Sequence, residues 1–236
     1  MTEDDRLAHL VEELASKRSY AIGGRQFPQP VSEGDAIAIA EALAISVDEG
    51  TSAREHAAAE QGMSIACHDG CNYCCEVPVM IFRPEALAAA RWLARPENST
   101  ARARFLDNYP RWRDAIGDAP AQLSDLFARA DPRYEEELIA LWKKRILCAF
   151  NHEGHCVIYP VRPIGCRNAH ALDTNDRCRP DHPKGSAEAL SFIPLDQFML
   201  RASSLLRATH NAMTAERHRL EIVCEAVHRL VAAPDQ

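Results

Sequence analysis

Residues 67–75 read CHDGCNYCC and place four cysteines within a run of nine residues. Four further cysteines follow within residues 148–178, whereas most of the chain has none. A soft metal is the usual reason for thiolates at this density, and zinc and iron–sulfur clusters are the two realistic choices. The sequence therefore predicts one composite metal site with eight candidate ligands, which are Cys67, Cys71, Cys74, Cys75, Cys148, Cys156, Cys166 and Cys178.

The spacing inside this first cysteine segment, residues 67–75, suits a loop that wraps around a metal. Gly70 tolerates a positive φ, which helps backbone N–H groups to point at sulfur. Cys74 and Cys75 are adjacent, so their side chains diverge and serve two metals, or two corners of a cluster, more easily than one ion. Because one loop cannot easily complete the ligand shell, we expect this segment to meet the second cysteine segment, residues 148–178, in space.

The second cysteine segment has long and irregular spacings between its cysteines. Simple zinc knuckles usually carry two short Cys-x2-Cys pairs, and this segment carries none. The prediction is therefore an iron–sulfur cluster in preference to zinc, held by a metalloprotein with a structural, metal-handling or redox role. His68, His152, His155, His170 and His182 are each expected to be loop residues, with His152 or His155 as the alternative to one thiolate.

A longer pattern joins the two segments. The first segment, CxxxCxxCC, is followed by a later pair of cysteines and by IYPVRPIGCR at residues 158–167. This arrangement resembles the YkgJ-type cysteine-cluster proteins, which are described as zinc- or iron-chelating domains. The resemblance covers residues 67–178 and implies a ligand role for Cys67, Cys71, Cys74, Cys75, Cys148, Cys156 and Cys166. Cys178 is added as an eighth ligand, although its spacing fits the pattern less closely.

Two enzymatic interpretations stay open, and neither assigns catalytic residues. Flagellin lysine N-methylases are similar in having a cysteine cluster beside an S-adenosylmethionine-dependent activity, so the alternative function is a methyltransferase-like enzyme. The run Cys67-x3-Cys71-x-Tyr73-Cys74 also resembles the radical S-adenosylmethionine signature. Radical enzymes of that kind need a partial α/β barrel, and the residues that follow predict one short extended stretch and then helices.

Basic residues accompany the second cysteine segment. Residues 143–179 hold seven basic residues against three acidic ones, in a chain whose net charge is −7. Arg162 and Arg167 are expected to do structural work, by donating hydrogen bonds to carbonyl groups or by offsetting negative charge near Cys166. Cys224 borders an apolar stripe on the last predicted helix, so it is expected to pack as a small hydrophobic residue and not to bind metal.

Composition and charge narrow the class of protein further. The acidic start of the chain lacks the basic and apolar regions of a secretory signal, and no apolar run reaches the roughly 18 residues that a membrane helix needs. We therefore expect a cytosolic protein with reduced thiols and no membrane contact. The net charge of −7 argues against general nucleic-acid binding. The expected partner is a metal ion or cluster.

Hydrophobic periodicity predicts a mostly α fold. We expect a single irregular helical domain with two cysteine-rich loops and at most a small β-hairpin, placed around NHEGH at residues 151–155. Its parts are N-terminal helices in residues 1–60, a cysteine-cluster domain with a helical insertion in residues 61–184, and a C-terminal helical pair in residues 185–236 that packs on the same core.

Caps and helix breakers set the expected element boundaries. Ser32 and Asp35 resemble a capping box for a helix over residues 36–49, and Gly50 predicts a break before a new helix. Further helices are expected at residues 4–17, 51–61 and 85–93, and residues 18–31 are expected to form a linker. Residues 99–144 are expected to form three helices, interrupted at Pro110, 117–120 and Pro132.

Overall fold

The computed structural model describes residues 19–22, 25–27, 31–68, 70–171, 174–181, 197–213 and 219–232. Within these residues the fold is mostly α, as predicted, and the strands occur only in short antiparallel pairs. The helix predicted at residues 4–17 lies outside the described residues, as does His182. Among the described helices, none combines the length and the hydropathy that crossing a membrane requires.

The longest element is α2 (Glu33–Glu60), which runs without a break through Gly50. The predicted capping box is confirmed, because the Ser32 side chain accepts from the Asp35 N–H at 3.2 Å and Asp35 accepts from the Ser32 N–H at 3.3 Å. The predicted break at Gly50 is wrong. A glycine inside a helix costs only about 1 kcal/mol relative to alanine, and Gly50 is buried by tertiary packing.

The helix instead ends at a glycine in the left-handed region. Gly62 has φ 76°, its N–H donates to the Ala59 carbonyl, and the Met63 N–H donates to the Ala58 carbonyl, both at 3.0 Å. This is the hydrogen-bond pattern of a Schellman cap, which needs a residue with positive φ just beyond the helix. The chain therefore leaves α2 in a defined direction and enters the first cysteine segment.

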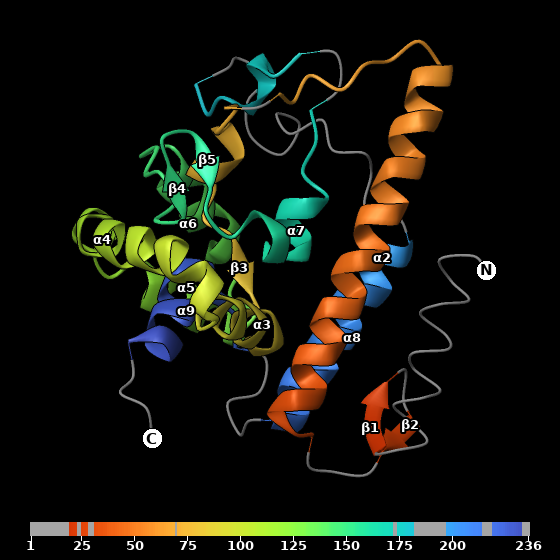
Figure 1. Cartoon of the computed structure of the whole chain (residues 1–236), viewed down its shortest axis with the longest axis vertical. Coiled ribbons are helices and arrows are strands. Elements are labelled where there is room, and N and C mark those ends of the chain that lie inside the picture. The colour runs from red at the N-terminus through yellow and green to blue at the C-terminus, as the bar shows by residue number, and fades with distance from the viewer. Residues whose placement is uncertain are drawn as a thin grey trace.

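One apolar core lies between α2, α3 (Arg83–Leu93) and α8 (Gln197–Met213). Its centre includes Leu43 and Val47 of α2 and Leu205 and Leu206 of α8, all at most 2% exposed. Figure 1 shows α2 and α8 side by side on one side of the molecule.

A second apolar core lies between α3, α4 (Ser99–Ile116) and α9 (Val223–Val231). Helical spacing places Phe105, Tyr109 and Trp112 on the buried face of α4, and the Phe105 ring stacks on Phe150 with centroids 4.1 Å apart. The predicted interruption at Pro110 is wrong, because α4 continues through this exposed position, where water can satisfy the freed carbonyl group.

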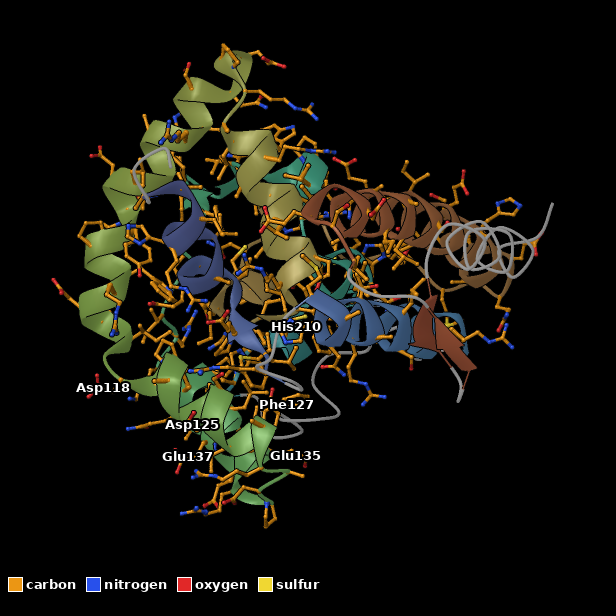
Figure 2. All side chains as sticks on the ribbon, turned by 90° about the horizontal axis from the view of Figure 1, so that it is seen from below. Asp118, Asp125, Phe127, Glu135, Glu137 and His210 are labelled. Atoms are coloured by element: carbon orange, nitrogen blue, oxygen red, sulfur yellow. The ribbon has the colours of Figure 1, made fainter. Side chains whose placement is uncertain are left out.

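A helical pair, α5 (Ala119–Ala128) and α6 (Arg133–Trp142), completes the three helices predicted for residues 99–144. Phe127 and Tyr134 join the two helices through an edge contact with ring centroids 5.4 Å apart. The acidic side chains of Asp125, Glu135 and Glu137 are exposed and lie on the outside of this pair (Figure 2). These acidic residues therefore form a solvated face and take no part in the cysteine region.

The described residues contain three strand pairs, and one of them joins segments far apart in the sequence. β1 (Ser19–Ile22) pairs with β2 (Arg25–Phe27), where the sequence predicted only a linker. β3 (Met80–Ile81), in the stretch predicted as a strand or an extended entry to a helix, pairs with β6 (Glu221–Ile222). The predicted hairpin around NHEGH is confirmed as β4 (Asn151–His152) and β5 (His155–Cys156).

Candidate metal centre

The first cysteine segment is a loop that closes into a short 3₁₀ helix, η1 (Tyr73–Glu76). The Cys71 N–H donates to the His68 carbonyl at 3.0 Å, which closes a turn in which Gly70 has φ 80°. The Cys75 N–H donates to the Asn72 carbonyl at 2.9 Å and starts the 3₁₀ turn. The glycine expected to need a positive φ is therefore used in that way, and it bends the loop between Cys67 and Cys71.

The second cysteine segment is organised by the β4–β5 hairpin and by one arginine. The hairpin turn has positive φ at Glu153 (53°) and Gly154 (86°), and the Asn151 Oδ1 accepts from the Gly154 N–H at 3.1 Å. Arg167 is 4% exposed and donates to the carbonyl groups of Arg162 at 2.8 Å and Pro160 at 2.6 Å. The structural role predicted for Arg167 is confirmed, since it holds the IYPVRP turn beside Cys166.

The two segments meet, as the sequence predicted. The Cys148 N–H donates to the Cys75 carbonyl at 2.8 Å, and the Ala66 N–H donates to the Ala171 carbonyl at 2.8 Å. A side chain at Gly154 would reach within 3.5 Å of the Gly70 Cα atom, so the hairpin turn and the first loop are in close approach. Backbone contacts at both ends of the first segment thus fix it against the second.

A cavity of about 600 Å³ lies between these segments, and seven cysteines line it. Apolar side chains from the second core, Phe150, Ile158 and Val223, line part of its wall. The seven lining cysteines are Cys67, Cys71, Cys74, Cys75, Cys148, Cys156 and Cys166. Every residue to which the family resemblance assigned a ligand role is therefore on the wall of this one cavity.

Cys178 and Cys224 stand outside that set, and both are buried. Cys178 closes the short 3₁₀ helix η4 (Asp176–Cys178), close enough to Cys67 and Cys71 for their charges to interact. Cys224 packs within the second core, as predicted, but its Sγ lies 3.4 Å from the Cys148 Sγ. Sequence reasoning missed this contact, because no local pattern links residues so far apart in the chain.

Burial makes several of these thiols resist ionisation. Burial raises the pKa of Cys156 to about 12 and that of Cys178 to about 11, with neighbouring thiols adding to both shifts. Burial also raises the pKa of Cys166 well above the ordinary value. A hydrogen bond between the two adjacent thiols lowers the pKa of Cys75 and raises that of Cys74. Several thiolates can coexist here only when a cation offsets their charge, which is the chemistry of a metal-binding donor set.

Histidines and one carboxylate border the cavity. His68, His155 and His170 line it together with Glu55, and the His170 Nδ1 lies 3.0 Å from a Glu55 carboxylate oxygen. His152, one of the two histidines predicted as an alternative ligand, does not line it, whereas His155 does. His155 is therefore the better placed of the two imidazoles.

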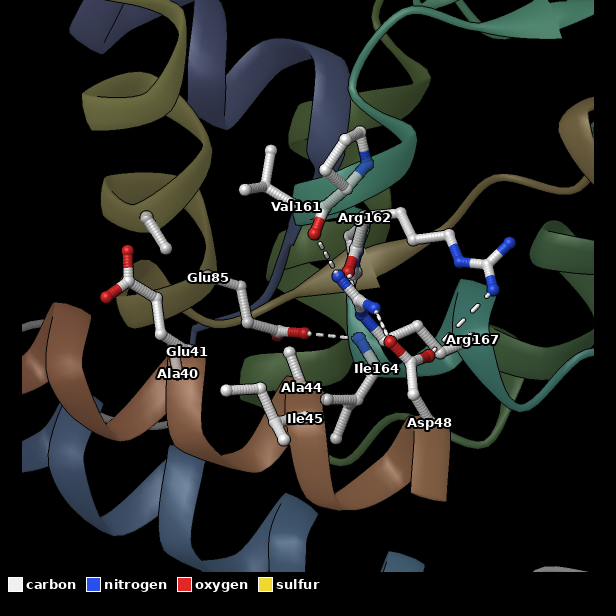
Figure 3. A pocket seen from close by; sticks show the side chains of 13 residues that line it. Ala40, Glu41, Ala44, Ile45, Asp48, Glu85, Val161, Arg162, Ile164 and Arg167 are labelled. Atoms are coloured by element: carbon white, nitrogen blue, oxygen red, sulfur yellow. Dashed lines mark hydrogen bonds and ion pairs between the residues drawn. The ribbon is translucent and has the colours of Figure 1, made fainter. Parts of the chain in front are cut away.

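A smaller cavity of about 290 Å³ lies between α2, α3 and α7 (Ile164–Arg167), and Arg162 lines both cavities. Figure 3 shows Glu85 on its wall and the ion pair between Arg167 and Asp48. Glu85 is buried and accepts from the N–H groups of Phe82 at 3.2 Å and Ile164 at 3.1 Å. The Glu85 carboxylate thus joins α3 to the segment that carries Cys166.

In the part of the chain that the structure describes, no three His, Cys, Asp or Glu side chains form a group that could hold a metal ion as they are placed. No protein-family model matches the chain, and no similar curated protein or solved structure was found.

Proposed function

We propose that this protein binds an iron–sulfur cluster, or alternatively zinc, through a composite site built from both cysteine segments. The observation that carries the proposal is the single cavity of about 600 Å³ lined by seven cysteines from distant parts of the chain. Thiolates are the ligands of iron–sulfur clusters and of many zinc sites, and few other functions call for so many at one place. The arrangement also supports our inference that the chain is a YkgJ-type protein.

The access to the cavity favours a redox or metal-handling role over a purely structural one. Cys67 is exposed, and the other six cavity-lining cysteines are partly exposed. Structural zinc sites are usually closed by four ligands, whereas a centre that exchanges electrons or metal needs a path to a partner. When bound, an iron–sulfur cluster would supply one-electron transfer. The chain's own contribution is to hold the thiols, to exclude part of the solvent with Phe150 and Ile158, and to place Arg162 near Cys156.

Ligation requires the thiols to turn toward a common centre. Each cysteine has one side-chain torsion, so this movement needs rotation about the Cα–Cβ bond and no change in the fold. Each ligating thiol gives its proton to the solvent as its bond to the metal forms. The short backbone hydrogen bonds between the two segments keep the cysteine Cα atoms in place during that change.

An S-adenosylmethionine-dependent enzyme is the second candidate, and the cavity volume is the observation in its favour. A volume of about 600 Å³ exceeds what one metal ion needs and falls within the range of small-molecule sites. The methyltransferase-like form of this candidate fits a helical body better than the radical form. The radical form needs a partial α/β barrel, and the described residues are mostly helical.

Anaerobic purification followed by visible spectroscopy and analysis of iron, zinc and acid-labile sulfide tests the proposal. We expect a brown protein that contains iron and sulfide. A colourless protein with bound zinc would select the zinc form of the proposal, and a protein that binds neither after reconstitution would contradict it. The Cys166→Ala variant should lose bound metal. Binding of S-adenosylmethionine by the metal-loaded protein, measured by calorimetry, would favour the second candidate.

A further inference from the structure

The number of thiols in the cavity exceeds what one centre uses. One zinc ion or one cubane or rhombic iron–sulfur cluster is held by four protein ligands. Seven cysteines line the cavity, and Cys178, which does not line it, lies close enough to Cys67 and Cys71 for their charges to interact. A single four-ligand centre would therefore leave half of these eight thiols unused.

Four of the cavity-lining thiols share mutual charge interactions, and we call them the inner thiols: Cys75, Cys148, Cys156 and Cys166. Each of their six pairs lies close enough for the two charges to repel each other. The Cys148 N–H donates to the Cys75 carbonyl, and the β4–β5 hairpin fixes Cys156 against the same segment. The inner thiols thus have the number that one four-thiolate centre requires, and they would bind it by turning toward a common point.

Three other thiols, which we call the outer thiols, form a separate set: Cys67, Cys71 and Cys178. The charges of all three pairs interact, and no inner thiol contributes to the raised pKa of Cys67 or of Cys178. The Ala171 N–H donates to the Cys67 Sγ at 3.3 Å, and the Asn175 side-chain amide donates to the Cys71 Sγ at 3.8 Å. Ala171 and Asn175 therefore approach two of the outer thiols and supply N–H donors to their sulfurs.

Cys74 lies at the boundary and gives the outer set its fourth thiol. Its charge interacts with Cys75 and Cys166 on one side and with Cys71 on the other. Cys74 and Cys75 are successive residues of η1, and successive side chains of a 3₁₀ helix point about 120° apart. The two thiols share a hydrogen bond as they are placed, and rotation about each Cα–Cβ bond would let them face different centres.

We propose that the cavity holds two separate metal centres, one on the inner thiols and one on the outer thiols together with Cys74. The inference rests on the proposed function and deepens it, since it assigns the ligands to two four-thiolate sites for soft divalent ions or for clusters. Each site forms its metal–sulfur bonds as its thiols release their protons to the solvent.

Cadmium titration of the full-length, metal-free protein under reducing conditions tests the proposal. Cadmium prefers thiolates, and its NMR signal reports on each coordination site separately. We expect two cadmium ions per chain and two signals. The Cys67→Ser/Cys178→Ser variant should lose one signal and about half of the cadmium, and the Cys156→Ser/Cys166→Ser variant should lose the other. Cys224→Ala is the matched control and should keep both.

The alternative outcomes are distinct from one another. One ion per wild-type chain, or the loss of all cadmium in both double variants, would mean one shared centre and would overturn the proposal. A wild-type chain that binds no cadmium, zinc or iron would overturn the proposed function itself. The wild-type stoichiometry decides the question even when a double variant fails to fold, which far-UV circular dichroism detects.

Discussion

The inner thiols and two of the outer thiols, Cys67 and Cys71, border the same cavity, but the chain around them is held in place in different ways. Near the inner thiols, Phe150 and Ile158 are at most 2% exposed and belong to the second apolar core. Near the outer thiols, no described residue from 61 to 72 is buried. Contacts such as the pair of Glu55 and His170 take the place of apolar packing there. Packing therefore positions the inner thiols before any metal binds, whereas the described residues from 61 to 72 have few contacts of their own to order them.

Removal of bound metal should give the largest effect and should separate the two regions most clearly. Structural zinc contributes roughly 10–16 kcal/mol to the folding of zinc-finger peptides. We expect chelation to speed amide hydrogen exchange in residues 61–72 and 174–178 by about tenfold or more, and to change residues 149–158 much less. Mass spectrometry of exchanged peptides measures both regions in one sample. Equal acceleration in both regions would remove the distinction.

A void created in the second apolar core by truncating Phe105 should give the next largest effect. The Phe105 side chain is fully buried and stacks on Phe150, which follows Cys148 by two residues. Phe105→Ala should lower the free energy of unfolding by about 3–5 kcal/mol and reduce metal bound at the inner thiols. Urea denaturation and metal analysis measure the two effects. Phe127→Ala, in the α5–α6 pair away from the cavity, is the control and should leave metal content unchanged.

Protonation of Glu85, which joins α3 to the segment that carries Cys166, should change the stability of the fold. Burial raises the pKa of this carboxyl from 4.5 to about 7, and this effect exceeds the opposing effect of the N–H groups that it accepts from. The folded state therefore keeps a proton that the unfolded chain releases, so stability should fall as pH rises from about 4.5 to about 7, by on the order of 2 kcal/mol.

The Glu85→Gln variant tests this pH dependence. Glutamine offers one acceptor oxygen for the two N–H groups, so we expect a stability lower by about 1 kcal/mol but without the decline across that pH window. Thermal or urea unfolding at a series of pH values measures the slope. Glu41 is a partly exposed residue that lines the same smaller cavity as Glu85, and Glu41→Gln should retain the wild-type slope. An unchanged slope in Glu85→Gln would assign the decline to another group.

Replacement of Cys224 should give the smallest effect. Its side chain is 1% exposed and packs in the second core, although its sulfur lies 3.4 Å from the Cys148 Sγ. Cys224→Ala should cost about 1 kcal/mol of stability and leave metal content unchanged, because Cys224 does not line the cavity. Metal analysis beside Cys148→Ala gives the comparison. A loss of metal equal to that of Cys148→Ala would place Cys224 among the ligands.

Local sequence signals predicted the parts of the fold that depend on neighbouring residues. The cap at Ser32, the hairpin at NHEGH and the carbonyl contacts of Arg167 all follow from residues within a few positions of one another. Gly50 misled the prediction, because burial within α2 outweighs its low helix propensity. The pairing of β3 with β6 joins residues 80–81 to residues 221–222 and leaves no local trace in the sequence.

The candidate site divides in the same way. The density of cysteines identified the residues that line the cavity, and the family resemblance named seven of them. Their separation into inner and outer thiols was not predictable from spacing, because it depends on which backbone segments lie against η1. The contact of Cys224 with Cys148 likewise arises from α9, which the β3–β6 pair brings to the second segment.

The residues that line the cavity are far apart in the sequence, so the ribosome makes them at different times. A ribosome adds roughly 5–20 residues per second, so roughly 5–20 seconds pass between the emergence of Cys67 and that of Cys166. During that interval four crowded thiols stand in a loop whose opposite wall does not yet exist. An ion captured early would meet an incomplete ligand set, and an oxidant would meet neighbouring thiols ready to form a disulfide. A nascent chain built in this order depends on reducing, metal-poor surroundings until its second half has folded.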